Sequence, residues 1–134
     1  MKAYFRDEVL PMPQGSTTFH ESEEHLKPST RDMHRALVSL MEELEAVDWY
    51  QQRMDATEND DLRSILRHNR DEEQEHAAMV LEWIRRHDAG WERQLRDYLF
   101  KEGSIVAREG AAEQGNGSGE RVNGASIGSL RARR

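Results

Sequence analysis

Apolar residues recur with a helical period through the middle of the chain, and this pattern predicts its secondary structure. Residues 29–102 contain no proline and one glycine, Gly90. The periodic segment is interrupted over residues 56–61, where Thr, Asn and Asp favour turns and caps over helix interiors. We therefore expect one helix from about Ser29 to Asp55 and a second from about Asp60 to Asp88.

The ends of these helices carry local signals. Ser29 and Asp32 resemble a capping pair at the start of the first helix. Ala89-Gly90 is expected to end the second helix, because glycine often follows a helix C-terminus, and a shorter helix is expected over residues 91–100. The short break indicates an antiparallel hairpin of two helices, each about 40 Å long at 1.5 Å per residue. Two helices cannot enclose a core alone, so a partner chain is expected.

Both flanks of the helical segment differ from it in composition. Residues 1–28 hold all three prolines, so this N-terminal extension is expected to be irregular apart from one short helical turn. Residues 103–134 are rich in Gly, Ala, Ser, Asn and Arg, which is typical of a flexible linker. The predicted domain is therefore residues 29–102, and the predicted fold class is all-α.

Charge and composition exclude several classes of function. The 134-residue chain has a net charge of -7, whereas nucleic-acid binding requires a basic surface. It contains no cysteine, which excludes disulfides, thiolate zinc sites and cysteine-ligated iron–sulfur clusters. No run approaches the roughly 20 apolar residues of a membrane helix, and Asp7, Glu8 and Pro11 interrupt any secretory signal. We expect an intracellular, soluble protein with no nucleic-acid or membrane partner.

Charged residues occupy helix faces that should be buried. At about 100° per residue, Glu43 lies at the centre of the apolar stripe of the first helix, Glu73 lies at the centre of that of the second, and His76 lies about 60° from Glu73. The stripes consist of Ala36, Leu40, Val47, Tyr50 and Met54 on the first helix and Leu62, Leu66, Ala77, Val80 and Ile84 on the second. Burying an isolated carboxylate is costly, so these groups require a partner.

A bound metal ion removes that cost. Glu73 and His76 have the i, i+3 spacing of Glu-x-x-His, which places a carboxylate and an imidazole on one helix face. Such a donor set suits Fe, Mn or Zn better than Ca or Mg. The spacing also arises by chance in polar helices, so the shared phase of Glu43 and Glu73 is the stronger indication. A structural protein whose buried carboxylates are hydrogen-bonded or protonated is the alternative.

The number of ligands points to a shared site. A di-iron four-helix bundle needs one Glu from each of two helices and Glu-x-x-His from each of the other two. This chain supplies Glu43 and a single such motif, Glu73 with His76, because none of the other histidines has a Glu three residues before it. One chain therefore supplies half of the ligands, and a two-fold dimer would supply the whole set.

Four further residues are weaker candidates. Glu42, Glu45 and Trp49 share the face of the first helix opposite its apolar stripe. They form either a cation-uptake site or a solvated face with one aromatic contact. Tyr50 shares the stripe with Glu43, either as a hydrogen-bond donor or redox-active residue beside the metal or as a core tyrosine.

Two uninterrupted blocks of sequence resemble the encapsulated ferritins, which are bacterial and archaeal ferroxidases housed in encapsulin nanocompartments. The blocks are MEELEAVDWY at residues 41–50 and HNRDEEQEHAAM at residues 68–79. The similarity extends through residues 81–86 and 98–100, so it covers roughly residues 30–103.

The resemblance implies a half-ferritin fold, an antiparallel two-helix hairpin plus a short C-terminal helix. Two such chains dimerise into a four-helix-bundle-like core, and dimers assemble into a decameric ring. Glu43, Glu73 and His76 match the di-iron ligands, with two iron ions at each dimer interface. The implied activity is a ferroxidase, which oxidises Fe(II) to Fe(III) with dioxygen for mineral storage inside an encapsulin shell.

The resemblance also assigns roles to neighbouring residues. Glu42 and Glu45 match acidic residues that bind metal on its way in. Trp49 and Tyr50 match aromatic residues flanking these sites, and Tyr50 is a candidate catalytic residue.

The C-terminal tail resembles the family's encapsulin-targeting peptide at about residues 125–131 (ASIGSLR). Ile127 and Leu130 would fill apolar pockets on the inner surface of the shell. The implied location is cytoplasmic, within the nanocompartment. The remaining alternatives are a ferritin-like di-metal peroxidase or manganese-binding protein, and a non-catalytic helical cargo or adaptor.

Overall fold

The computed structural model describes residues 18–115, and these residues form helices and no strand. In chain order the elements are the 3-10 helix η1 (Glu23–His25) and the α-helices α1 (Pro28–Ala56), α2 (Asp60–His87), α3 (Ala89–Tyr98) and α4 (Ala107–Gly115). The predicted all-α class, with a long hairpin followed by a short helix, is confirmed. Within the described residues, 18–88 and 89–115 belong to two compact units, which are described separately.

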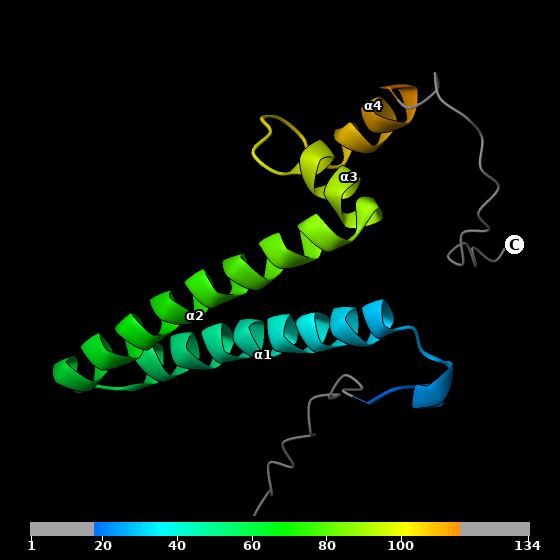
Figure 1. Cartoon of the computed structure of the whole chain (residues 1–134). Helices are drawn as coiled ribbons and strands as arrows, with labels where there is room; N and C mark the ends of the chain where they lie inside the picture. Colours follow the sequence, from blue (N-terminus) through cyan, green and yellow to red (C-terminus); the bar gives the residue numbers. More distant parts are fainter. Residues whose placement is uncertain (1–17, 116–134) are drawn as a thin grey trace, which may run out of the picture. The chain divides into compact units, whose positions relative to one another are not determined.

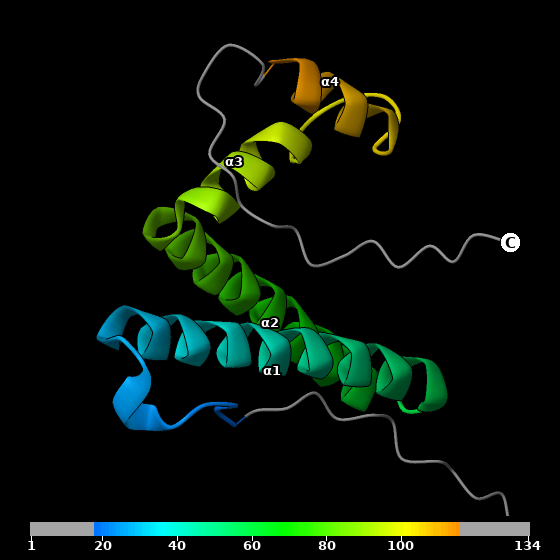
Figure 2. The same cartoon turned by 90° about the vertical axis from the view of Figure 1, so that its right-hand side faces the viewer.

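Helices α1 and α2 lie side by side and antiparallel, joined by a short turn (Figures 1 and 2). Asn59 caps α2, because its side-chain Oδ1 accepts a hydrogen bond from the backbone N–H of Leu62 at 2.9 Å. Arg63 donates from Nε to the carbonyl oxygen of Met54 at 3.2 Å and from Nη2 to that of Thr57. These bonds satisfy polar groups that both helix ends would otherwise leave without partners.

The buried core of the hairpin is small. Within the described residues, the buried apolar side chains are Met54, Leu66, Ala77 and Ile84. Met54 belongs to the apolar stripe predicted for the first helix and the other three to that of the second, as the predicted phase requires. Leu62, predicted to belong to the second stripe, is 45% exposed near the start of α2, so the prediction is wrong at this residue. Several large apolar side chains on other faces of the hairpin remain exposed, which leaves apolar surface for a partner.

The start of α1 differs from the prediction. The helix begins at Pro28 with Lys27 as its N-cap, and no side chain caps it, so the predicted capping pair of Ser29 and Asp32 is wrong. Proline suits the first helical position because its φ is already helical and its missing N–H would have no partner there. The 3-10 helix η1 is the one short helical turn expected before the long helices.

The end of α2 also differs. The helix ends at His87, and Gly90 lies inside α3 instead of terminating α2 as predicted. The chain leaves α2 through Asp88 in an extended conformation, with φ -140° and ψ 117°, so no left-handed glycine is needed there.

Part of the segment predicted to be a linker forms the helix α4. Its residues are mainly Ala, Glu, Gln and Arg, which are strong helix formers. The backbone N–H of Ala107 donates to Ser104 Oγ at 3.3 Å, which caps the start of this helix. Composition over the whole tail concealed this short helical run.

None of the helices in residues 18–115 has the length and apolar character required to cross a bilayer. The predicted targeting peptide at about residues 125–131 lies outside the described residues, as do residues 1–17.

Candidate metal centre

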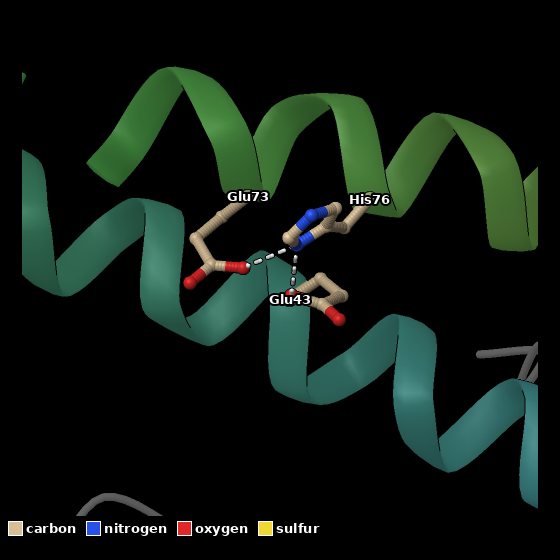
Figure 3. Close-up of side chains that lie close together, drawn as sticks. All are labelled: Glu43, Glu73 and His76. Atoms are coloured by element: carbon tan, nitrogen blue, oxygen red, sulfur yellow. Dashed lines mark hydrogen bonds and ion pairs between the residues drawn. The ribbon is translucent and has the colours of Figure 1, made fainter. Parts of the chain in front are cut away.

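Three side chains of the kinds that can bind a metal ion converge between α1 and α2 (Figure 3). Glu43 comes from α1, and Glu73 and His76 come from successive turns of α2. The Nδ1 of His76 lies 3.0 Å from Oε2 of Glu73 and 3.9 Å from Oε2 of Glu43. We call these three residues the donor triad. The structure brings together the three residues that helical phase placed on facing stripes.

The secondary structure explains how the donor triad forms. Glu73 and His76 are three residues apart, so their side chains leave the same face of α2. Glu43 lies on the α1 stripe that packs against that face. The side chains of Glu43 and Glu73 are 25% and 24% exposed, whereas that of His76 is 47% exposed. The carboxylates are therefore held between the helices, and the imidazole borders the open side of the hairpin.

The pKa values of the two carboxyl groups of the donor triad are shifted in opposite directions. The pKa of Glu43 is raised, chiefly by a hydrogen bond with Glu73 and also by burial and by the charge of Glu73. Hydrogen bonds with Glu43 and His76 lower the pKa of Glu73. The pKa of His76 is raised, chiefly by its hydrogen bond with Glu73. As pH falls, Glu43 therefore takes up a proton before Glu73 does.

The donor set fits a transition-metal ion. One donor atom from each triad residue lies within 4.8 Å of the other two. Ligand atoms that each lie about 2.0–2.2 Å from one ion are roughly 3–4.4 Å apart, so small side-chain movements would close the triad around one ion. Two carboxylates with an imidazole suit Fe, Mn or Zn. Elsewhere in the part of the chain that the structure describes, no group of three or more His, Asp or Glu side chains meets this spacing.

The other predicted site residues lie outside the donor triad. Glu42 and Glu45 are exposed on α1, Trp49 is also exposed, and Tyr50 is half-buried. The guanidinium carbon of Arg53 lies 5.9 Å from the ring centre of Trp49 and 5.6 Å from that of Tyr50. The structure does not join these residues to the donor triad of the same chain.

Sequence reasoning missed a polar contact that links the two helices close to the donor triad. Arg70 on α2 donates from Nη1 to Oε1 of Gln51 on α1 at 2.7 Å. Gln51 follows the stripe residue Tyr50, and Arg70 lies three residues before Glu73. The sequence did contain a signal for this contact, because Gln51 and Arg70 are long polar side chains beside the two facing apolar stripes.

The hairpin and its donor triad define a ferritin-like helical protein, since facing carboxylates with Glu-x-x-His are the ligand set of ferritin-like bundles. The family model described as EncFtn-like matches residues 18–102. The chain belongs to the EncFtn-like family.

Individual relatives agree with this assignment. The chain is 60% identical over 108 residues to an encapsulated ferritin-like protein of Rhodospirillum rubrum, covering 81% of this chain and 77% of the relative. It is 38% identical over 77 residues to an encapsulin nanocompartment cargo protein of Myxococcus xanthus, covering 58% of each chain. A crystal structure of a protein from Nitrosomonas europaea matches with 56% identity and a TM-score of 0.64, covering 66% of this chain and 97% of that one.

Proposed function

We propose that this protein is a ferroxidase, which oxidises Fe(II) to Fe(III) with dioxygen at a di-iron centre formed between two copies of the chain. The observation that carries the proposal is the donor triad, in which Glu43, Glu73 and His76 meet within 4.8 Å from two helices. This is half of the ligand set of a di-iron four-helix bundle. Iron is the substrate, and each Fe(II) gives up one electron to dioxygen.

The chain's own groups would prepare the centre for iron. Glu43 and Glu73 supply negative charge that offsets the charge of two cations held close together. Any proton on Glu43 or on Nδ1 of His76 must leave before all three donors face iron. The partly buried position of both carboxylates limits their solvation by water and strengthens their interaction with a cation.

A second copy of the chain is needed for two reasons. The donor triad is half of a ligand set, and the α2 face that carries His76 continues as exposed apolar surface. On this face Ile65 is 57% exposed and Met79 is 58% exposed. Met79 and Trp83 also border a groove of about 420 Å³ between the start of α1 and the C-terminal half of α2. A two-fold copy packed on this face would cover it and bring two triads together.

The remaining assignments belong to the same proposal. Glu42, Glu45 and Trp49 take up iron from outside the dimer, and Tyr50 flanks the centre. Dimers assemble into a decameric ring. The family membership and the names of the relatives from Rhodospirillum rubrum and Myxococcus xanthus support a role as cargo of an encapsulin shell in the cytoplasm, recruited through residues 125–131. The oxidised iron would be stored as mineral inside the shell.

Stopped-flow absorbance of Fe(II) oxidation in air tests the proposal. Glu43→Ala, Glu73→Ala and His76→Ala should each slow oxidation by more than about tenfold, because each removes a ligand from both halves of the centre. Glu58→Ala and His25→Ala remove the same side chains from exposed positions outside the triad and should oxidise iron like wild type. Wild-type rates in all three triad variants would contradict the proposal. Faster turnover with hydrogen peroxide than with dioxygen would instead indicate a peroxidase.

A further inference from the structure

Arg70 bridges the two long helices at a half-buried position. Its side chain is 23% exposed, and on its own helix Nε and Nη2 donate to Oδ1 of Asp71 at 3.0 and 2.6 Å. The remaining arm of the guanidinium crosses to α1, where Nη1 donates to Oε1 of Gln51 at 2.7 Å. The ion pair with Asp71 fixes the direction in which this arm points.

The amide of Gln51 is fixed as well. Its Nε2 donates to Oδ1 of Asp55, one turn further along α1, at 2.9 Å. This bond assigns the nitrogen side of the amide, so the oxygen side faces Arg70. Four side chains, Asp55, Gln51, Arg70 and Asp71, therefore form one continuous hydrogen-bonded chain across the hairpin, which we call the clamp.

The clamp lies between the turn and the donor triad. Arg63 closes the turn by bonding the carbonyl oxygens of Met54 and Thr57. Beyond the clamp, Glu73 follows Arg70 by three residues, which is one helical turn. The clamp is therefore positioned to control how α1 and α2 align where Glu43 meets the donors of α2.

The donor triad depends on this alignment because its ligands come from two helices. Metal ligands must be held to within about 0.5 Å, whereas a slip of one residue along a helix moves a side chain by about 1.5 Å. The four buried apolar side chains of the hairpin attract without a preferred direction. Hydrogen bonds are directional, so the clamp resists a slip that the apolar core tolerates.

We propose that the clamp sets the register of the metal centre, with Gln51 and Arg70 as positioning residues for Glu43, Glu73 and His76. This inference rests on the proposed function only in taking the donor triad as a metal site. Neither Gln51 nor Arg70 bonds a triad side chain, so both act through the alignment of the helices.

The charge of Arg70 allows a positioning role to be distinguished from a purely electrostatic one. A positive charge one turn from Glu73 disfavours a bound cation, so its removal would strengthen metal binding if electrostatics alone mattered. If the clamp positions the ligands, its removal weakens metal binding instead. The two explanations of Arg70 therefore predict opposite signs for the same substitution.

The experiment is titration of the full-length protein with Co(II), followed by the visible absorbance of the bound ion. Gln51→Leu keeps roughly the size of the side chain but removes the two clamp bonds made by the Gln51 amide, and it should weaken Co(II) binding about tenfold and change the absorbance spectrum. Gln52→Leu is the matched control. Gln52 is the next residue of α1, and its Nε2 donates to Asp48 on the same helix at 2.8 Å, so its loss should change the affinity less than twofold.

Arg70→Met and the double variant complete the test. Arg70→Met should also weaken Co(II) binding. The double variant with Gln51→Leu should bind Co(II) as tightly as the single variant with the lower affinity, because both substitutions remove the same contact between α1 and α2. Tighter binding by Arg70→Met overturns the proposal, as does a Gln51→Leu variant that melts earlier yet binds Co(II) like wild type. Wild-type protein that binds Co(II) but fails to oxidise Fe(II) would contradict the ferroxidase proposal and leave the clamp standing.

Discussion

Glu43 on α1 and Glu73 on α2 face each other across the hairpin, and their interaction raises the pKa of Glu43 and lowers that of Glu73. Two ionised carboxylates at this position repel each other, and a proton on Glu43 would remove the repulsion. A cation placed between them would remove it as well. A proton on Glu43 and a bound cation would therefore compete with each other at this pair.

Glu43→Gln should stabilise the metal-free protein at neutral pH. A group with a raised pKa in the folded state contributes stability at low pH that is lost as pH rises through that pKa. The glutamine amide stays neutral and donates to Glu73 at every pH, so the loss should disappear. Thermal unfolding with a chelator from pH 4 to 8 measures this, with Glu58→Gln as the exposed control. The variant should melt a few degrees above wild type at pH 8 and close to it at pH 4.

The same substitution should abolish metal binding while it raises stability. An amide oxygen is a poor replacement for a carboxylate ligand of Fe or Co. A variant that melts at a higher temperature but no longer binds Co(II) would show that Glu43 serves metal binding and does not stabilise the fold. Loss of stability at pH 8 would show that repulsion between the two ionised carboxylates is not the main interaction at this pair.

Metal affinity should fall steeply as the solution is acidified. The ring of His76 must be neutral and Glu43 must be ionised to bind a cation, and both have raised pKa values. The loss should therefore begin above the usual histidine pKa of about 6.5 and continue below it. Co(II) titrations from pH 5 to 8 in matched ionic strength measure it. In a weakly buffered solution, binding at pH 7 should release protons, and an affinity independent of pH would contradict the assignment of these ligands.

The sequence contained enough information to predict the donor triad, since helical periodicity is a local property. The phase of Glu43 depends only on its spacing from residues such as Met54, and that of Glu73 on its spacing from Leu66 and Ala77. The polar break at residues 56–61 then required the two stripes to face each other. These three observations placed Glu43 opposite Glu73 without knowledge of any contact.

Contacts made by the ends of long side chains were not predictable in the same way. Arg70 reaches Gln51 because Asp71 directs its guanidinium, and nothing in residue spacing shows which neighbour will do so. The start of α1 at Pro28 was missed because the spacing of Ser29 and Asp32 resembles that of an N-terminal capping pair. Helix α4 was missed because the surrounding tail dominated the composition.

Removing the cap of α2 should weaken the hairpin without altering the donor triad. Asn59→Ala removes the acceptor for the backbone N–H of Leu62 and should cost about 1 kcal/mol. Glu58→Ala is the control, since it changes the neighbouring exposed residue of the turn. Chemical denaturation with a chelator measures the difference, and Co(II) affinity under native conditions should be unchanged. A cost below about 0.3 kcal/mol would indicate that Arg63 alone holds the turn closed.

A charge on the exposed apolar face of α2 should separate the two halves of the proposed centre. Met79 lies one turn beyond His76 on α2 and is 58% exposed, so Met79→Glu leaves the donor triad of each chain intact. In a two-fold dimer packed on this face the new carboxylate would be buried without a partner, and the dimer should dissociate. Native mass spectrometry and sedimentation would detect the monomer.

The monomer produced by Met79→Glu should oxidise Fe(II) more than about tenfold slower than wild type, because half of the ligands are missing. Leu44→Glu is the matched control, since Leu44 is 56% exposed on α1 and lies outside the apolar stripe of that helix. It should keep both the dimer and the activity. A monomeric Met79→Glu protein that oxidises iron at the wild-type rate would show that one hairpin suffices, because the triad of a single chain would then be a complete site.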